Sequence, residues 1–468
     1  MARQRSHTGY WIRAFIVLTA VLGGCAQNAP YHTGVGAAGN CRGVPVSDVC
    51  SKAYYQEHDG YDLAFAEYSD RGNAFDDSYI ADVLKRISDK ARGEGVVLVV
   101  FVHGWKHNAD EADPNLIDFK KALMAVHGIL QKDFGASELG KRRLVGLYVG
   151  WRGANLTWPG IEQATFWDRK AVAGEVGKGG VTRLLLELDE FTGDRDENVM
   201  VVIGHSFGGA IVVSALNDIL TERVIHRTRG KGYAPTLGDG VLVLNPAIEA
   251  NQALTFVEAA IQADDRPEQQ PLFVSLSSDA DWATHIAFPA GQTVGLLATW
   301  RQTDLRRSYY YDREKPNEKK VLREQHLDTT TVGNFAPFLT HRLTASEVEG
   351  KTLFHVRTCD AFPEGCKPKG LTTLDGLPAI RKLPKNYPLF FFKTDDTVMT
   401  GHNDIFNQRV RSFVVTVIDD VVRRSLAKVH MKEAGVPTAA QMSILADPKA
   451  LEQRMESILQ QMPPDSGA

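Results

Sequence analysis

Cysteine is scarce in this sequence, and neither sign of charge dominates it. The 468 residues include five cysteines, and the formal net charge is −4. Because the chain has no strongly basic balance, nothing in its composition indicates a nucleic-acid partner. Metal binding by cysteine is also disfavoured, since no cysteine pair has the two-residue gap of a zinc knuckle and no histidine lies at a familiar spacing.

The N-terminal apolar run, residues 14–22, is too short for a permanent membrane anchor. A membrane-spanning helix needs roughly 20 apolar residues, about twice the length of this run. Arginines precede the run and two glycines follow it. This order is typical of a secretory signal, so we expect residues 1–24 to be removed.

The end of this segment, Leu22-Gly23-Gly24-Cys25, resembles the bacterial lipoprotein box, in which the cysteine receives diacylglycerol. The resemblance implies that Cys25 becomes the lipid-anchored N-terminus, with acyl chains such as palmitate, and that the protein resides in the cell envelope. Ala26 replaces the Asp typical of inner-membrane retention, which implies the periplasmic face of the outer membrane in a Gram-negative cell. The alternative is an ordinary signal peptide followed by a chance cysteine.

The other four cysteines form two close sequence pairs, Cys41 with Cys50 and Cys359 with Cys366. In the oxidising compartment that export implies, each pair can form a disulfide. The sequence leaves the connectivity open, since four cysteines allow three arrangements.

Three regions follow the signal. Residues 25–42 are small, polar and Gly-rich, and predict an unfolded tether. Residues 43–430 form the body, in which helical stretches alternate with short, continuously apolar runs. Such runs are typical of strands buried on both faces of a mostly parallel α/β sheet, with helices on both sides. The predicted strands are 96–102, 144–149, 199–203, 241–244, 272–276 and 389–392.

Two parts of the chain stand outside this alternation. Residues 284–388 are polar in their middle, and we expect an insertion that forms a cap or side lobe with local helices or strands. Residues 431–468 form a helical tail, which either packs on the body or serves an interface.

The most informative segment is Gly204-His205-Ser206-Phe207-Gly208, which follows a predicted strand and precedes a helix. In such a turn the glycines give a crowded backbone room, and the serine hydroxyl stands exposed above the sheet. The pentapeptide alone also fits a tight Gly-rich turn, but the strand before it and the helix after it favour a nucleophile elbow. We therefore predict that Ser206 is a nucleophile.

With this motif the chain resembles the α/β-hydrolase superfamily, specifically bacterial esterase-like serine hydrolases with a Gly-His-Ser-Phe-Gly elbow, over about residues 96–424. The resemblance implies the α/β-hydrolase fold, with the large insertion before the catalytic histidine. It also implies an oxyanion hole in the loop after an early strand. The donors would be the backbone N–H groups of Trp105 or Gly104 and of Phe207.

The family order is nucleophile, acid and then histidine. His402 follows the last predicted strand and precedes a helix, so the resemblance implies that it takes the serine proton. The loop after 272–276 offers two carboxylates at the family's acid position. Asp281 is preferred, because related sequences resemble the Asp-Trp-Ala-Thr stretch that it begins, and Asp279 is the rival.

The implied activity is hydrolysis of carboxylic esters through an acyl-enzyme, without a metal or organic cofactor. Lipases, phospholipases, thioesterases, amidases and peptidases use the same triad, so the substrate stays open, as does the oligomeric state. The expected partners are a small-molecule or lipid ester and, through the anchor, a membrane. A non-catalytic envelope lipoprotein that binds through this scaffold is the alternative from a different class.

Overall fold

The computed structural model describes most of the body and leaves the predicted signal and Cys25 outside the described part. The described residues are 28–34, 39–42, 48–135, 141–153, 166–229, 236–261, 270–289, 303–307, 320–360, 366, 383, 387–434 and 443–463. Within these ranges, no helix combines the length and the apolar character needed to cross a membrane.

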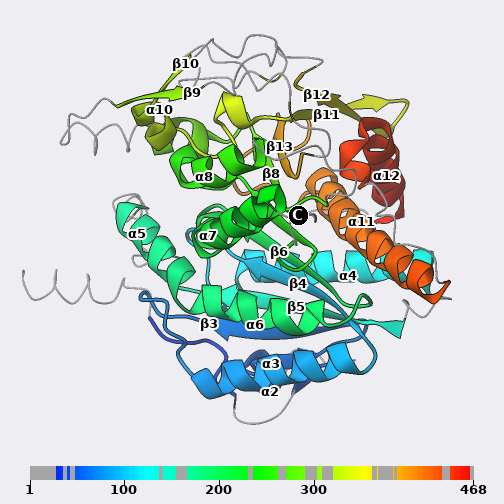
Figure 1. Ribbon diagram of the computed structural model, residues 1–468. Helices are drawn as coiled ribbons and strands as arrows, with labels where there is room; N and C mark the ends of the chain where they lie inside the picture. Colours follow the sequence, from blue (N-terminus) through cyan, green and yellow to red (C-terminus); the bar gives the residue numbers. More distant parts are fainter. Residues whose placement is uncertain are drawn as a thin grey trace, which may run out of the picture.

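Eleven of the described strands assemble into one large, mostly parallel sheet (Figure 1). The antiparallel pairs are β2 with β3 and β11 with β12. In spatial order the strands are β1 (Gly39–Asn40), β2 (Tyr55–Glu57), β3 (Tyr61–Glu67), β5 (Arg143–Gly150), β4 (Val96–Val102), β6 (Val199–His205), β7 (Gly240–Leu244), β8 (Phe273–Ser278), β13 (Leu389–Thr394), β11 (His341–Val348) and β12 (Lys351–Thr358).

Helices cover both faces of this sheet (Figure 1). One face carries α3 (Asp77–Arg92), α5 (Phe166–Val176), α6 (Thr182–Gly193), α7 (Phe207–Arg229) and α8 (Ala250–Ile261). The opposite face carries α4 (Pro114–Phe134), α11 (Gln408–Glu433) and α12 (Pro448–Gln461). This is the predicted α/β-hydrolase fold.

Strand β4 shows why a continuous apolar run becomes a central strand. All its residues are buried, and successive side chains enter opposite cores. Leu98 and Val100 join the core under α3 and α7, whereas Val99 and Phe101 join the core under α4 and α11. Alternation of side chains across a strand requires this division, so both faces must be apolar.

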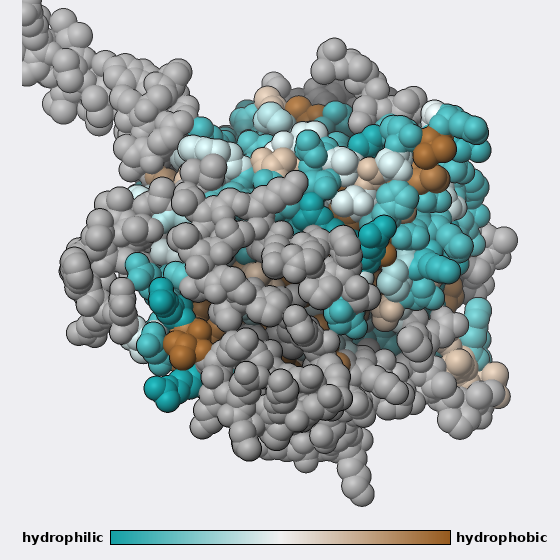
Figure 2. Space-filling view, turned by 90° about the horizontal axis from the view of Figure 1, so that it is seen from above, coloured by the Kyte–Doolittle hydropathy of each residue, from teal (hydrophilic) through white to brown (hydrophobic). Residues whose placement is uncertain are grey.

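The predicted insertion adds strands to the main sheet as well as forming structure of its own. β11 pairs in parallel with β13, and the β11–β12 hairpin thereby extends the sheet edge. A separate ribbon pairs β9 (Asp304–Arg307) with β10 (Lys320–Arg323), and the short α10 (Glu324–Thr329) follows. Seen from above, the described surface on this side is mainly hydrophilic (Figure 2).

The start of the described chain contacts the body more closely than the sequence predicts, and the tail takes one of its two predicted arrangements. In the expected tether, the backbone N–H groups of Tyr31 and His32 donate to the Glu67 carboxylate, and the His32 ring stacks on Phe65 with centroids 3.4 Å apart. These residues are not an unfolded linker, because the carboxylate at the end of β3 satisfies their backbone donors. The tail helix α12 also packs on the body, where Met455 is fully buried.

Both predicted cysteine pairs are disulfides. Cys41 is joined to Cys50, and Cys359 is joined to Cys366. The structure thus resolves the connectivity that the sequence leaves open.

Candidate active site

Ser206 stands at a sharp turn between β6 and α7. Its φ is 56°, a left-handed conformation that is unusual for a residue other than glycine. Gly204 and Gly208 flank it where side chains would not fit: a Cβ on Gly208 would lie 2.0 Å from the Val102 carbonyl oxygen. The sequence motif therefore forms the strained elbow that it predicts.

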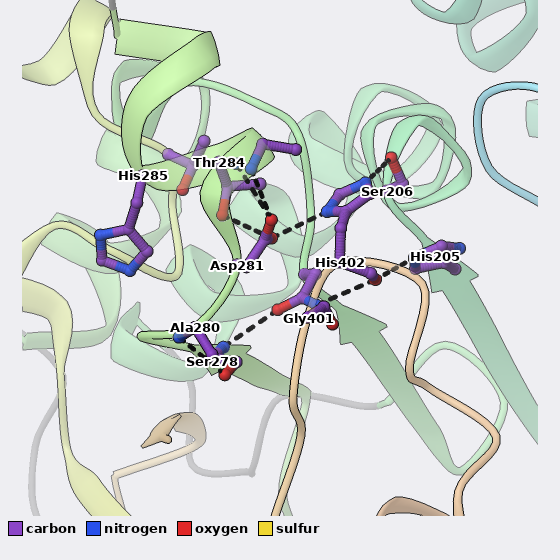
Figure 3. Close-up of polar contacts among 12 residues, drawn as sticks. His205, Ser206, Ser278, Ala280, Asp281, Thr284, His285, Gly401 and His402 are labelled. Atoms are coloured by element: carbon purple, nitrogen blue, oxygen red, sulfur yellow. Dashed lines mark hydrogen bonds and ion pairs between the residues drawn. The ribbon is translucent and has the colours of Figure 1, made fainter. Parts of the chain in front are cut away.

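His402 lies between Ser206 and Asp281 and hydrogen-bonds to both (Figure 3). The distance from His402 Nε2 to Ser206 Oγ is 2.6 Å, and the distance from His402 Nδ1 to Asp281 Oδ2 is 2.8 Å. With neutral His402, the serine hydroxyl donates to Nε2 and the Nδ1–H group donates to the carboxylate. The structure thus brings together three side chains that are far apart in the sequence.

Asp281 is buried and fully engaged as an acceptor. Its Oδ1 accepts from the backbone N–H groups of Ala283 and Thr284, and its Oδ2 accepts from the Thr284 hydroxyl at 2.6 Å. Burial alone would raise the pKa of Asp281, but His402 and the donors of Thr284 lower it to about 2. This side chain is therefore an anion that is held in one orientation.

The rival acid, Asp279, faces a different group of residues. Its Oδ2 accepts from Arg342 at 2.5 Å, and its Oδ1 lies 3.3 Å from Lys393 Nζ. Of the two carboxylates, the structure places only Asp281 against His402.

The predicted oxyanion loop lies beside the serine. A Cβ on Gly104 would come within 2.9 Å of Ser206 Cβ, so the loop backbone closely approaches the nucleophile. Phe207 begins α7, where its backbone N–H group has no intrahelical partner. Trp105 follows Gly104 in the same loop, and its ring lies 6.4 Å from that of Phe207. The backbone of the predicted oxyanion loop and the first residue of α7 therefore lie next to Ser206.

His103 fixes the shape of this loop and takes no part in the hydrogen bonds of Ser206. Its Nδ1 donates to the Gly104 carbonyl at 3.0 Å, and its Nε2 accepts from the Trp151 N–H group at 3.1 Å. Burial lowers the pKa of His103 to about 4, which keeps the ring neutral and this pattern intact. Trp151 in turn donates its indole N–H to the His103 carbonyl, so it packs as part of the scaffold.

Two residues hold the His402 loop in place: His205, which has no predicted role within the elbow motif, and Asn245, which the sequence does not single out. His205 Nε2 donates to the His402 carbonyl at 2.9 Å, and the Asn245 side-chain amide donates to the same oxygen at 3.1 Å. Asn245 Oδ1 also accepts from the Ser278 N–H group, at the start of the loop that carries Asp281. The only available signal is position, because Asn245 follows directly after β7, at the carboxyl edge of the parallel sheet.

No group of three or more metal-ligating side chains occurs within the part of the chain that the structure describes. The arrangement around Ser206 offers a hydroxyl group, an imidazole that accepts from it and a carboxylate that accepts from the imidazole. These groups are sufficient for acyl transfer by general-base catalysis.

Comparison with known proteins finds little sequence similarity and a weak structural one. No protein-family model and no curated protein matches the chain. A structure of phospholipase PlaB from Legionella pneumophila in complex with thio-NAD is 14% identical and has a TM-score of 0.22, with 56% of this chain and 48% of that chain covered. A second PlaB structure is 12% identical and has a TM-score of 0.26, with 79% and 64% covered. This chain thus spans less than two thirds of either structure, and similarity at this level carries no information about its substrate.

Proposed function

We propose that the protein is a serine hydrolase that cleaves carboxylic esters through an acyl-enzyme. The observation that carries this proposal is the line of two hydrogen bonds from Ser206 through His402 to Asp281, at 2.6 Å and 2.8 Å. A serine hydroxyl is a poor nucleophile at neutral pH, and this line supplies the base that takes its proton.

In the acylation step, Ser206 Oγ attacks the ester carbonyl carbon while its proton moves to His402 Nε2. Asp281 accepts from Nδ1 and stabilises the imidazolium that forms. The backbone N–H groups of Phe207 and of Trp105 or Gly104 donate to the oxyanion. When the carbon–oxygen bond to the alcohol breaks, His402 returns the proton to the leaving oxygen.

Deacylation repeats these steps with water as the nucleophile. His402 takes a proton from water, the resulting oxygen attacks the acyl carbon, and the proton then returns to Ser206 Oγ as the carboxylic acid leaves. No cofactor enters the balance of atoms and electrons.

A lipid ester is the second candidate for the substrate. The side chain of Trp282, which directly follows Asp281, is 64% exposed, and that of Trp167 is 41% exposed. Exposed indoles are favoured at membrane–water interfaces, where one side of the ring is apolar and the N–H is hydrated. A lipid substrate would fit the proposed anchor, and a series of esters of increasing acyl length distinguishes lipase-like from short-chain activity.

The protein is proposed to act at the bacterial envelope, held by a lipid on Cys25. The two disulfides support an oxidising compartment. The test is mass spectrometry of the mature N-terminal peptide, compared with the distribution of Cys25→Ala between membrane and soluble fractions. Diacylated Cys25 and release of the variant are expected, whereas an unmodified Cys25 in the mature protein contradicts the proposal.

The hydrolase proposal is tested with a fluorophosphonate probe, which reacts with an activated serine. We expect the purified protein to be labelled, and Ser206→Ala, folded to the same extent by circular dichroism, to be unlabelled. If the folded wild-type protein is not labelled and cleaves no ester, thioester, amide or peptide in a screen, the non-catalytic lipoprotein becomes the better description.

A further inference from the structure

A lysine lies in the interior of the central sheet, directly after the apolar residues 389–392 of its strand. Lys393 belongs to β13 and is paired with Ser277 of β8 and Arg342 of β11. Its side chain is 0% exposed. Burial of an ammonium group is unfavourable unless the group is paired and hydrogen-bonded, so its partners indicate its role.

Among the residues that the structure describes, three side chains contact the ammonium group. Lys393 Nζ donates to Asn334 Oδ1 and to His285 Nε2, the latter at 2.7 Å, and lies 3.3 Å from Asp279 Oδ1. His285 lies beyond Thr284 on the side away from His402 (Figure 3). Lys393 and these three side chains therefore form a buried polar cluster behind the loop that carries Asp281.

The hydrogen bonds from Lys393 run in one direction. An ammonium group only donates, so Asn334 must turn its oxygen toward Lys393 and its NH2 group away. Asn334 Nδ2 then donates to Thr284 Oγ1 at 3.2 Å, which leaves the Thr284 hydroxyl hydrogen free to point at Asp281 Oδ2, 2.6 Å away. That same Oδ2 accepts from His402 Nδ1. Hydrogen bonds aligned in this way polarise and strengthen one another.

We propose that Lys393 is a positioning residue for the triad, linked to Asp281 by Asn334 and Thr284. This inference rests on the proposed hydrolase function. Lys393 fixes the direction of the Thr284 hydroxyl, and the hydroxyl holds Asp281 in place and offsets part of its charge. With this charge partly offset, Asp281 stabilises an imidazolium at His402 less strongly than an unpaired carboxylate would.

Charged neighbours support a cationic Lys393. Burial lowers the pKa of Lys393 to about 8, while Asp279 and Asp281 oppose this shift, so the ammonium form predominates at neutral pH. Arg342 also faces the group and is shared between Asp279 and Asp395, whose Oδ2 is 3.0 Å from the guanidinium. On the triad side, His402 faces Asp281 and the neutral His205.

The first test replaces Lys393 with methionine, whose side chain has a similar length but carries neither the charge nor the hydrogen-bond donors. We expect the acid limb of the pH profile for fluorophosphonate labelling to move to higher pH by about half a unit to one unit, because the positive charge no longer opposes protonation of His402. Labelling at neutral pH is expected to fall roughly tenfold, as Asp281 loses its fixed donor.

Thr284→Val tests the same series of hydrogen bonds while leaving Lys393 unchanged. It also keeps the proposal testable if Lys393→Met does not fold. Valine keeps the shape of threonine and both backbone N–H groups on Asp281, so the variant loses only the hydroxyl, which donates to Asp281 and accepts from Asn334. The acid limb of the labelling profile of Thr284→Val should also move to higher pH. The matched control is Lys90→Met, which removes a partly buried lysine 3.1 Å from Asp62 and leaves the profile unchanged.

An independent measurement separates this inference from the proposed function. The pKa of the His402 imidazole is followed by NMR in the wild type, Lys393→Met and Thr284→Val, with His402→Gln to assign the signal. A raised imidazole pKa in both variants supports the link from Lys393 to Asp281 even if no hydrolysis is found. In that case only the proposed function fails. Labelled, folded variants with the wild-type acid limb and an unchanged imidazole pKa would overturn the inference and leave Lys393 as a purely structural residue.

Discussion

Asp279 and Asp281 show how much of a site depends on the direction of single side chains. Both belong to one loop after β8 and are nearly equivalent in the sequence. In the structure Asp281 points to His402 at 2.8 Å, whereas Asp279 points to Arg342 at 2.5 Å. The sequence narrows the acid to two residues, but the choice depends on contacts with β11 and β13, which lie far along the chain.

Under the proposed hydrolase mechanism, replacement of Asp281 by asparagine is expected to reduce ester turnover by roughly 10⁴-fold, because an amide in place of the carboxylate favours the wrong tautomer of His402. Turnover is measured with a chromogenic ester at neutral pH, after circular dichroism has shown native structure. Asp396→Asn is the matched control, since that exposed carboxylate lies in the turn before His402. Equal turnover in Asp281→Asn and wild type would remove Asp281 from the triad.

Lys393 and Asn245 have roles that the residue type and the local sequence do not predict. A charged residue at the end of an apolar run predicts the end of a buried strand, yet Lys393 is buried because its partners come from two other segments, the stretch after β8 and the loop of Asn334. Asn245 has a φ of 42° and bridges the loops of Ser278 and His402, although no motif surrounds it. Neither role follows from local sequence, because both depend on long-range contacts.

At the scale of elements, the predicted strands with continuous apolar runs match the structure well, whereas strands of another pattern escape the sequence analysis. Each of the six predicted runs coincides with a strand, namely β4, β5, β6, β7, β8 and β13. β3 carries acidic residues at Asp62 and Glu67, and β11 is buried only in part. The β11–β12 hairpin lies at the sheet edge with one face partly exposed, so its apolar pattern is weaker than that of a central strand. For this reason the sequence assigns these residues to an insertion and not to the sheet.

The elbow between β6 and α7 depends on the close approach of that turn to β4. Gly208→Ala would place a methyl group 2.0 Å from the Val102 carbonyl oxygen, and backbone cannot yield as a flexible side chain can. We expect this variant to lose fluorophosphonate labelling and to melt at a lower temperature than the wild type, as followed by differential scanning fluorimetry. Gly193→Ala, where a Cβ meets nothing within 4 Å, is the matched control. Native labelling of Gly208→Ala would contradict the elbow geometry.

For the whole molecule, the body is larger than the alternating βα pattern alone predicts. The tail helix α12 lies on the same face as α4 and α11, and the chain near His32 docks on β3. Both segments cover parts of the body for which the sequence predicts no covering element. The sequence of an amphipathic helix or of a short polar segment does not show which surface it packs on. The stability of the protein therefore includes contacts made by both ends of the described chain.

Acid stability of the whole fold should reflect histidines that are buried in neutral form. Burial lowers the pKa values of His103 and His341 to about 4, and the pKa of His205 lies well below the usual range. A lowered histidine pKa contributes stability that is complete above the unfolded value of about 6.5 and is lost as the pH falls toward 4, because only the unfolded chain binds protons in that window.

His341 offers the cleanest test, because it lies away from Ser206 and stacks on Phe390 and Phe392. In His341→Gln, the free energy of unfolding in urea should fall less steeply between about pH 6.5 and pH 4.5 than in the wild type. The difference in slope corresponds to about one proton, or about 1.4 kcal/mol per pH unit at most. Parallel curves for the two proteins would mean that His341 titrates alike in the folded and unfolded states, and that other groups govern the loss of stability in acid.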